Sequence, residues 1–523
     1  MHSRRALLQQ IALAATAIAL PRWAWTRSSG LPAQFHLGIA SGEPTPDGIV
    51  LWTRLSPETP AAHQATHTVH WELAHDAQFR RIVQRGQALA APEWGHSVHV
   101  EVRGLEPGRW YHYRFHCGDA TSATGRTRTA PAADELPPRL RLAFASCQRW
   151  EHGHYAAWRH AAEQSLDLVL FLGDYIYEYA SPRNTTDLAR THALRHASTL
   201  ADYRDRYALH KSDPALQQAH AACPWLVTWD DHEVQNDYAS TWGRGHTSDF
   251  AVQRAAGWQA FYENMPLRAS ALTGGPTWAR LQLYRSTGWG RLARLHLLDA
   301  RQYRDWQACR PDSASSAPGM RPADCPALAD ERRSFLGMEQ EQWLDSALAA
   351  DAKAAQDCRW SVVAQQTLMA PRAYPSGVTS TDSWDGYPAA RSRALHSIAR
   401  HAPRNTVVLG GDIHQNYVCR LHAPGDAPGA PQGPAIASEF CGTSISSRSG
   451  TTQEKVDALV RLNPHVLLAR PDLRGYGLAE VTPQRWTTSL MTVDDPLRPN
   501  SPLSTLARFV VEDGTPGPQR DAG

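Results

Sequence analysis

The sequence predicts an α/β protein whose larger part is a sandwich of two sheets covered by helices, in four layers ordered α-β-β-α, preceded by an all-β domain. Short runs with a period of two fill the first third of the chain, and apolar runs alternating with helical stretches fill most of the rest. The pattern turns all-β again near the C-terminus, which suits a sandwich of two sheets. With 523 residues, 42% of them apolar, the chain can bury a large core.

The first segment, residues 1–30, has the pattern of an export signal. Arg4 and Arg5 precede an uncharged apolar stretch, residues 11–20, which is too short to span a bilayer. The segment resembles a twin-arginine signal, so we expect the twin-arginine translocation machinery as a partner and a periplasmic or extracellular protein. An ordinary amphipathic helix fits poorly because the stretch is apolar all round. No clear cleavage site follows, so an uncleaved anchor stays an alternative.

Composition restricts the partners and the redox state. The net charge of +2 comes from 53 basic and 51 acidic residues without clustered runs, so no stable nucleic-acid complex is expected. No second long apolar run follows, so no membrane span is expected in the mature form. The eight cysteines show no CxxC or zinc spacing. An oxidising destination permits disulfides, and Cys309 and Cys325 flank a Pro/Ser/Ala-rich loop that a bridge could close, although other pairings stay open.

Residues 31–130 are expected to form an accessory β-sandwich. Alternating runs such as 48–53, 66–71 and 96–102 are separated by turn residues and are rich in β-branched and aromatic side chains. The stretch 105–115 resembles the tyrosine-corner region of fibronectin type III and related sandwiches, which favours an immunoglobulin-like domain. Residues 131–138, rich in Pro and Ala, are then the expected linker.

Residues 139–511 are expected to form the layered α/β domain, followed by a flexible polar tail at 512–523. Its first strand covers residues 140–147, a helix follows at 155–164, and the apolar run 168–172 is a fully buried strand. The other expected strands are 225–228, 292–298, 360–363, 406–409, 434–441 and two or more within 477–493, and the other expected helices are 251–265 and 335–352. Residues 501–511 fit either a helix over the site or a segment docked on the core.

Four of the predicted strands end in residues that can bind metals. They are Ala145-Ser146-Cys147-Gln148, Gly173-Asp174-Tyr175-Ile176-Tyr177, Thr228-Trp229-Asp230-Asp231-His232-Glu233 and Gly410-Gly411-Asp412-Ile413-His414. Because α/β sheets place their sites at strand ends, we expect the four to meet at one edge. Singly the signals are weak, since a Gly-Asp pair is also a common turn. Together, with two adjacent carboxylates that repel unless a cation neutralises them, they favour the dinuclear site of a metallophosphoesterase.

These motifs, with others between them, resemble the PhoD-like alkaline phosphatases of the metallophosphoesterase superfamily. Order and spacing match from Phe35 to about Phe509. The stretches that carry the resemblance are 35–42, 50–55, 145–148, 173–179, 229–234, 299–304, 336–340, 411–414 and 439–441. The resemblance implies a metal-dependent phosphatase or phosphodiesterase that acts on phosphate mono- or diesters with an alkaline optimum. An export signal agrees with it, since the family is typically sent out folded with its metal loaded.

The resemblance also implies Fe³⁺ and Ca²⁺ as cofactors, with other divalent metals as alternatives. The implied iron ligands are Cys147, Asp174, Tyr177 and His414, with Asp174 bridging to calcium. The calcium ligands expected are Asp231, Asp412 and, unless it is only a turn residue, Asn236. The residue chemistry agrees in part, because phenolate and thiolate suit a trivalent ion whereas calcium takes oxygen donors. Tyr175 and Tyr179 are expected to be packing residues.

The implied mechanism is in-line attack on phosphorus by a metal-bound hydroxide, without a covalent phosphoenzyme. Asp174 and His232 are the expected catalytic residues, where His232 stabilises the transition state or protonates the leaving oxygen unless it only supports Asp231. Arg149 is the nearest arginine in sequence for holding the phosphate. No organic cofactor site is expected, because no GxxxxGK[ST] loop occurs. A purple-acid-phosphatase type of enzyme, which would need more histidine ligands, and a non-catalytic exported binding protein remain the alternatives.

Overall fold

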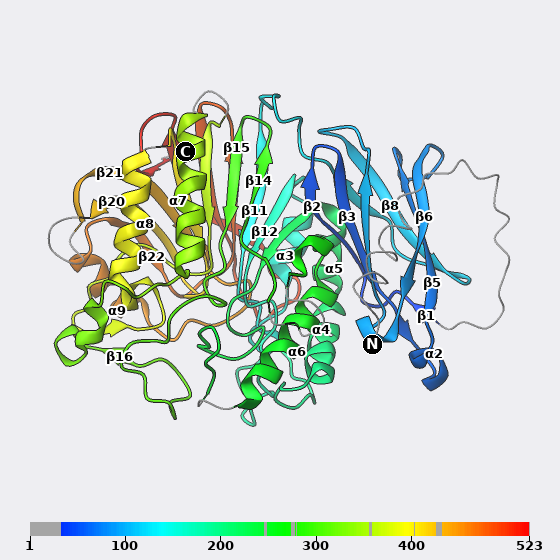
Figure 1. Ribbon diagram of the computed structural model, residues 1–523, viewed down its shortest axis with the longest axis horizontal. Helices are drawn as coiled ribbons and strands as arrows, with labels where there is room; N and C mark the ends of the chain where they lie inside the picture. The colour runs from blue at the N-terminus through cyan, green and yellow to red at the C-terminus, as the bar shows by residue number, and fades with distance from the viewer. Residues whose placement is uncertain are drawn as a thin grey trace.

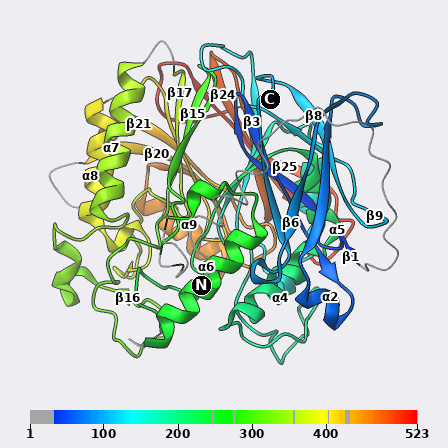
Figure 2. The same ribbon diagram turned by 45° about the vertical axis from the view of Figure 1, so that its right-hand side comes forward.

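The structure is a computed structural model that describes residues 33–244, 248–273, 278, 280–354, 358–401, 403–424 and 431–521 (Figure 1). The predicted export signal, residues 1–30, lies outside the described residues. Two large sheets occupy the middle of the molecule, with helices α7 (Met338–Lys353) and α8 (Pro388–His401) at one flank and the N-terminal strands at the other (Figures 1 and 2). Within the described ranges, no helix has the length and apolar character that a membrane crossing requires.

The larger sheet brings three of the four predicted strand ends together. Its strands, in spatial order, are β26 (Gln519–Arg520), β25 (Leu503–Glu512), β24 (Arg485–Val493), β23 (Arg474–Val481), β11 (Leu140–Ala145), β12 (Leu168–Leu172), β13 (Trp225–Thr228), β2 (Ile39–Thr45), β3 (Gly48–Arg54) and β7 (Ser97–Arg103). Strands β11, β12 and β13 are parallel, with Ala145 opposite Phe171 and Leu172 opposite Thr228. All of β12 is buried, as the uninterrupted apolar run predicts.

The smaller sheet packs face to face on the larger one and carries the fourth strand end. Its strands, in spatial order, are β14 (Arg285–Trp289), β15 (Ala293–Leu297), β17 (Trp360–Ala364), β19 (Thr406–Gly410), β21 (Pro431–Cys441), β20 (Asn416–Pro424) and β22 (Val466–Arg470). Leu170 of β12 lies in one apolar core with Val362 of β17 and Leu409 of β19. This shared core brings the end of β19 close to the ends of β11 and β12.

Two sets of helices cover the outer faces of these sheets. On the larger sheet, the helices bury apolar side chains together with Phe171 and Trp225. These helices are α3 (Ala156–Ala162), α4 (Leu200–Lys211), α5 (Pro214–Ala222) and α6 (Ser248–Asn264). On the smaller sheet, α7, α8 and α9 (Gln453–Leu462) share a core with Val363 of β17. The helices predicted near residues 155–164, 251–265 and 335–352 are thus confirmed as α3, α6 and α7.

The N-terminal region contains a further sheet, distinct from the larger and the smaller sheet, that packs on β2, β3 and β7. Its strands are β10 (Gly125–Arg128), β8 (Trp110–Cys117), β5 (His67–Ala74) and β6 (Ile82–Ala90), with β9 (Ala120–Thr121) beside β8, and the short helix α2 (Pro60–Gln64) precedes β5. Burial alternates strictly along β8, as a period of two requires. The Tyr111 hydroxyl accepts a hydrogen bond from the Glu106 backbone N–H at 3.0 Å, the backward contact typical of a tyrosine corner.

The strands of the N-terminal region are not all separate from the larger sheet, because β2 pairs in parallel with β13 of that sheet. The two strands meet where Gly42 lies opposite Trp225. A Cβ atom at position 42 would lie 2.6 Å from the Trp225 carbonyl oxygen, so only glycine permits this approach. Sequence patterns treat residues 31–130 as a unit, whereas three of their strands extend the sheet that carries the site.

Two expectations for the C-terminal region change with the structure. Residues 501–511 form most of strand β25 of the larger sheet, so the alternative of a helix over the site is wrong. The polar tail is also partly ordered, because β26 pairs with β25 through residues 519 and 520. Two short ladders complete the strands, β1 (Ala33–Gln34) with β4 (Ser56–Pro57) and β16 (Gly319–Met320) with β18 (Thr379–Ser380).

Candidate metal centre

Four of the predicted ligands lie in turns that follow the strand ends, and their backbone is strained. Cys147, Asp174, Asp412 and His414 all have positive φ angles between 55° and 64°, a region that residues other than glycine rarely adopt. Gly173 precedes Asp174 with φ of 107°, and a Cβ there would lie 2.5 Å from the Asp230 Cβ. Such strain persists only where the surrounding structure imposes it, and it concentrates at functional sites. The backbone therefore marks the same edge that the sequence motifs indicate.

The first cluster contains the four residues predicted to bind iron. Atoms of Cys147, Asp174 and His414 that can ligate a metal lie within 4.8 Å of one another. The Tyr177 hydroxyl donates to Asp174 Oδ2 at 2.8 Å and lies 3.1 Å from His414 Nε2. Ser447 supports the cluster, because its hydroxyl contacts the Tyr177 hydroxyl at 2.8 Å and the Cys147 carbonyl at 2.9 Å.

The electrostatics of this cluster fit a bound cation. Burial, followed by the charge of neighbouring acidic groups, raises the pKa of the Cys147 thiol and of the Tyr177 phenol. Burial also raises the pKa of Asp174 well above its ordinary value. Asp174 Oδ1 is buried and has no hydrogen-bond partner among the described residues. A cation at this point would satisfy that oxygen and compensate the thiolate and phenolate, so the residues fit the group that the family implies.

The second cluster shares Asp174 with the first. Ligating atoms of Asp174, Asp231 and His232 lie within 4.8 Å of one another, which is the arrangement that a bridging carboxylate requires. His232 Nδ1 lies 2.7 Å from Glu178 Oε2, and Glu178 is fully buried. Burial alone would lower the pKa of His232, but Asp231 and Glu178 raise it well above its ordinary value. The two carboxylates therefore favour the protonated form of His232.

A third cluster joins the predicted ligand Asp231 to two carboxylates that the sequence analysis did not predict as ligands. Carboxylate oxygens of Asp231, Asp237 and Asp382 lie within 4.8 Å of one another. Burial and then the charges of Asp382 and Asp231 raise the pKa of Asp237 to about 7. Asp237 continues the acidic stretch after Asn236, and this local acidity was the signal available in the sequence. Asp382 lies in a loop far along the chain, and nothing local connects it to the other two.

Asp412 and Asn236 are placed less directly than the other predicted ligands. Asp412 is absent from the three clusters of the described residues, but burial, Asp231 and Asp382 raise its pKa to about 6 against the effect of Arg301. Asp412 is therefore close enough to Asp231 and Asp382 for their charges to act on its carboxyl group. The Asn236 backbone N–H donates to Glu178 Oε1 at 2.9 Å, a contact that would also suit a turn residue.

Arg301 lies against these carboxylates; the sequence analysis included it in the stretch 299–304 but gave it no role in the site. Its guanidinium is 1% exposed, donates to Asp230 Oδ1 at 2.6 Å and forms a bidentate pair with Asp382 at 2.8 and 2.9 Å. It also lies 3.6 Å from Asp231 Oδ2. The Asp-Ala-Arg stretch directly after strand β15 was the available signal, since it repeats the pattern of polar residues at a strand end. Arg301 offsets part of the negative charge that gathers here.

Arg149 lies where a substrate could approach. Its side chain is 17% exposed and pairs with Glu151 at 3.3 Å. Its guanidinium lies 5.7 Å from the centre of the Tyr177 ring and 5.3 Å from that of Tyr179. Arg149 is thus next to the first cluster, as predicted. Tyr175 is fully buried in the core as predicted, whereas the half-buried Tyr179 ring also borders the site.

The two packed sheets and the ligating side chains at their strand ends define a candidate metal-dependent α/β hydrolase. Comparison with known proteins identifies the family. Residues 142–490 match the family described as PhoD-like phosphatase. Residues 22–131 match the family described as PhoD-like phosphatase, N-terminal domain. The chain belongs to the PhoD-like phosphatase family and is a phosphatase, a hydrolase of phosphate esters.

Individual relatives agree with this assignment. Alkaline phosphatase D of Bacillus subtilis (strain 168) is 41% identical over 490 residues, which cover 91% of this chain and 81% of the relative. A solved structure described as the structure of PhoD superposes with a TM-score of 0.84 at 40% identity, covering 94% of this chain and 92% of that one. The resemblance predicted from the motifs is confirmed. Neither the purple-acid-phosphatase type nor the non-catalytic binding protein is supported by these similarities.

Proposed function

We propose that this phosphatase is an exported, metal-dependent enzyme that hydrolyses phosphate monoesters and diesters at alkaline pH. The observation that carries the proposal is the convergence of thiol, phenol, imidazole and carboxylate around the buried, unpartnered Oδ1 of Asp174. A set of such groups, most of them buried, is costly unless a cation binds them. The alkaline optimum is proposed from the kinship with alkaline phosphatase D.

The proposed cations are Fe³⁺ and Ca²⁺. Fe³⁺ would be held by Cys147, Asp174, Tyr177 and His414, because thiolate and phenolate are strong anionic donors for a trivalent ion. Ca²⁺ would be held by oxygen donors on the other side of Asp174, with Asp231, Asp412 and Asn236 as ligands. When bound, the two ions would polarise the phosphate and make water a better nucleophile.

The side chains around the ions would then act on the substrate directly. We assign the nucleophile to water, attacking in line with the leaving oxygen, without a covalent phosphoenzyme. Arg149, at the edge of the first cluster, would bind a non-bridging phosphate oxygen. His232, kept protonated by Asp231 and Glu178, would stabilise the charge on the leaving oxygen or donate a proton to it. Glu178 holds the His232 ring in the orientation that this transfer needs.

The test uses bis(4-nitrophenyl) phosphate and 4-nitrophenyl phosphate as substrates. The purified protein should release nitrophenol from both, lose activity with a chelator, and lose at least about 100-fold in turnover in the Asp174→Asn variant. Asp134→Asn, at an exposed position, is the matched control and should remain active. Undiminished turnover in Asp174→Asn would refute the proposed site.

The identity of the cations has its own test. Ferric iron bound by Tyr177 and Cys147 should give a visible charge-transfer band and an iron content near one per chain. A colourless protein that is fully active without iron would refute the iron assignment while leaving metal-dependent hydrolysis intact.

Export and the finer architecture belong to the same proposal. Arg4 and Arg5 would direct the folded protein to the twin-arginine machinery, so Arg4→Lys/Arg5→Lys should leave it in the cytoplasm. Unchanged export of that variant would contradict this route. We also interpret the two packed sheets with outer helices as the four-layer α-β-β-α sandwich of metallophosphoesterases, with an immunoglobulin-like sandwich attached at the N-terminus.

A further inference from the structure

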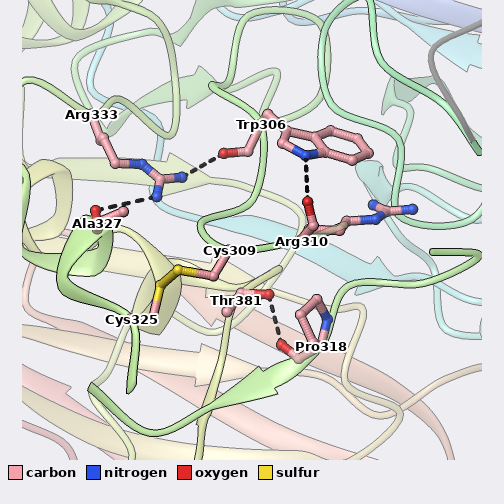
Figure 3. Close-up of a disulfide and its surroundings, with 8 residues drawn as sticks. All are labelled: Trp306, Cys309, Arg310, Pro318, Cys325, Ala327, Arg333 and Thr381. Carbon is pink, nitrogen blue, oxygen red and sulfur yellow. Dashed lines mark hydrogen bonds between the residues drawn. A yellow bond between two sulfur atoms is a disulfide. The ribbon is translucent and has the colours of Figure 1, made fainter. Parts of the chain in front are cut away.

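The disulfide between Cys309 and Cys325 closes a loop (Figure 3). This loop contacts Asp237 of the third cluster. Residues 309–325, here called the bridged loop, contain short turns, the two-residue strand β16 and a single turn of 3-10 helix at Pro322–Asp324. Cys325 is fully buried, in a small apolar cluster with Ala308 and Leu328. The other six cysteines are buried free thiols, so this loop contains the one disulfide among the described cysteines. Such a loop depends on its covalent bridge for a defined shape.

The bridged loop holds Asp237 by its backbone and by its side chain. The Arg310 guanidinium donates to the Asp237 carbonyl oxygen at 2.5 Å, and the Ala317 N–H donates to Asp237 Oδ2 at 2.7 Å. Gln307, just before the bridge, donates to the same carbonyl at 2.9 Å. Three donors on or beside the bridged loop therefore set the position of one carboxylate of the third cluster.

The bridged loop also holds the chain just before Asp382. Strand β16 pairs with β18, which ends two residues before Asp382. Thr381 donates from its hydroxyl to the Pro318 carbonyl oxygen at 2.7 Å (Figure 3). Gln307 donates to Asp382 Oδ1 at 2.7 Å as well as to the Asp237 carbonyl oxygen, so one side chain joins the Asp237 backbone to the Asp382 carboxylate. Asp237 and Asp382 thus come from distant segments and share one support.

The first cluster is built without this support. Its hydrogen bonds are made within the four residues themselves and with residues such as Ser447, Arg448 and Glu233, none of which belongs to the bridged loop. The hydrogen bonds of the described residues join no part of the bridged loop to Cys147, Asp174, Tyr177 or His414. The two sides of the site therefore have separate structural supports, and only one of them contains a disulfide.

We infer that the Cys309–Cys325 disulfide is a positioning device that holds Asp237 and Asp382 in place and thereby sets the Ca²⁺ affinity of the carboxylate side. Opening the bridge would weaken Ca²⁺ binding and leave iron binding at the first cluster intact. This inference rests on the proposed function, which assigns Asp231 to Ca²⁺, because Asp237 and Asp382 form the third cluster around Asp231. It makes full assembly of the site depend on an oxidising compartment.

The test is the Cys309→Ser/Cys325→Ala double variant, with Cys117→Ala, a buried free thiol in strand β8, as the matched control. Substitution is preferable to a reducing agent, because a dithiol would also compete for Cys147. Titration of the iron-loaded proteins with CaCl₂ should show about 10-fold weaker binding in the double variant, the usual effect of removing support from metal ligands. Iron content and the visible band should equal those of wild type.

A second variant keeps the inference testable if the double variant fails to fold. Thr381→Val preserves the disulfide and the side-chain shape but cuts the tie to Pro318, and it should weaken Ca²⁺ binding about fivefold. Amide hydrogen exchange at residues 379–382 should be faster in both variants. Ca²⁺ affinity within twofold of wild type in every variant that folds would overturn the inference alone. A wild-type protein that hydrolyses no phosphate ester and takes up no Ca²⁺ would overturn the proposed function as well.

Discussion

Arg301→Met is the substitution whose effect follows most directly from the structure. The guanidinium is 1% exposed and is shared by Asp230 and Asp382 through three hydrogen bonds of 2.6 to 2.9 Å. Methionine fills similar space without charge, so the buried Asp230 loses its ion-pair partner, while Asp382 keeps Arg304. Removing one partner of a buried ion pair costs about 3–5 kcal/mol of unfolding free energy. We expect a loss in this range at pH 7.

The assay is urea unfolding combined with calorimetry, with Arg332→Met as the control. Arg332 forms a similar pair with Asp330, but its side chain is 90% exposed, so the same substitution there should leave the stability almost unchanged. An unfolding entropy of about 2.1 cal/mol/K per residue over 523 residues converts the Arg301 loss to a fall in Tm of about 3–5 °C. A loss below about 1 kcal/mol, or one equal to that of the control, would refute the reasoning.

The pH dependence of the same variant tests the cause of the loss. Although burial raises it, Arg301 and Arg304 hold the pKa of Asp382 well below its ordinary value of 3.8. A depressed carboxyl pKa contributes stability that is present above the ordinary pKa and is lost as the pH falls. The difference between wild type and Arg301→Met should therefore be largest near neutral pH and shrink below about pH 4. A difference that is constant with pH would point to packing as the cause.

Three further predictions concern other parts of the chain. Glu178→Gln removes the charge that holds His232 and should lower kcat about 10- to 100-fold with little change in thermal stability, which stopped-assay kinetics and calorimetry check together. A hydrogen bond from His116 helps to lower the pKa of Glu72 to about 2. The ionised Glu72 therefore stabilises the fold by about 1 kcal/mol above pH 4.5, and this contribution is lost as the pH falls toward 2. Glu72→Gln should flatten that acid limb in a pH series of urea midpoints, and an unchanged limb would contradict the pairing. Gly42→Ala should destabilise the joint between β2 and β13 by about 1–3 kcal/mol in urea unfolding, because its Cβ would meet a carbonyl oxygen at 2.6 Å; a neutral effect would contradict the close approach.

The local features of the fold and of the first cluster were predictable from the sequence. The run 168–172 is apolar at every position and is followed by Gly173 and Asp174, so both the buried strand and the ligand at its end follow from neighbouring residues. The same holds for the ends of β11, β13 and β19. Parallel strands in one core bring such ends to one edge, which is why Cys147 and His414 meet although 267 positions separate them.

Other features were decided only by the tertiary structure. Residues 501–511 have an apolar pattern that suits either a docked helix or a strand, and the free edge of β24 determines that they pair as β25. Likewise, no local pattern joins Asp237, Asp382 and Arg301, which come from three loops far apart in the chain. The sequence by itself therefore determined which strands end in candidate metal ligands, because that pattern is local. Only the tertiary structure decided which distant carboxylates, arginine and disulfide-closed loop surround those ligands, because their meeting depends on how the two sheets pack.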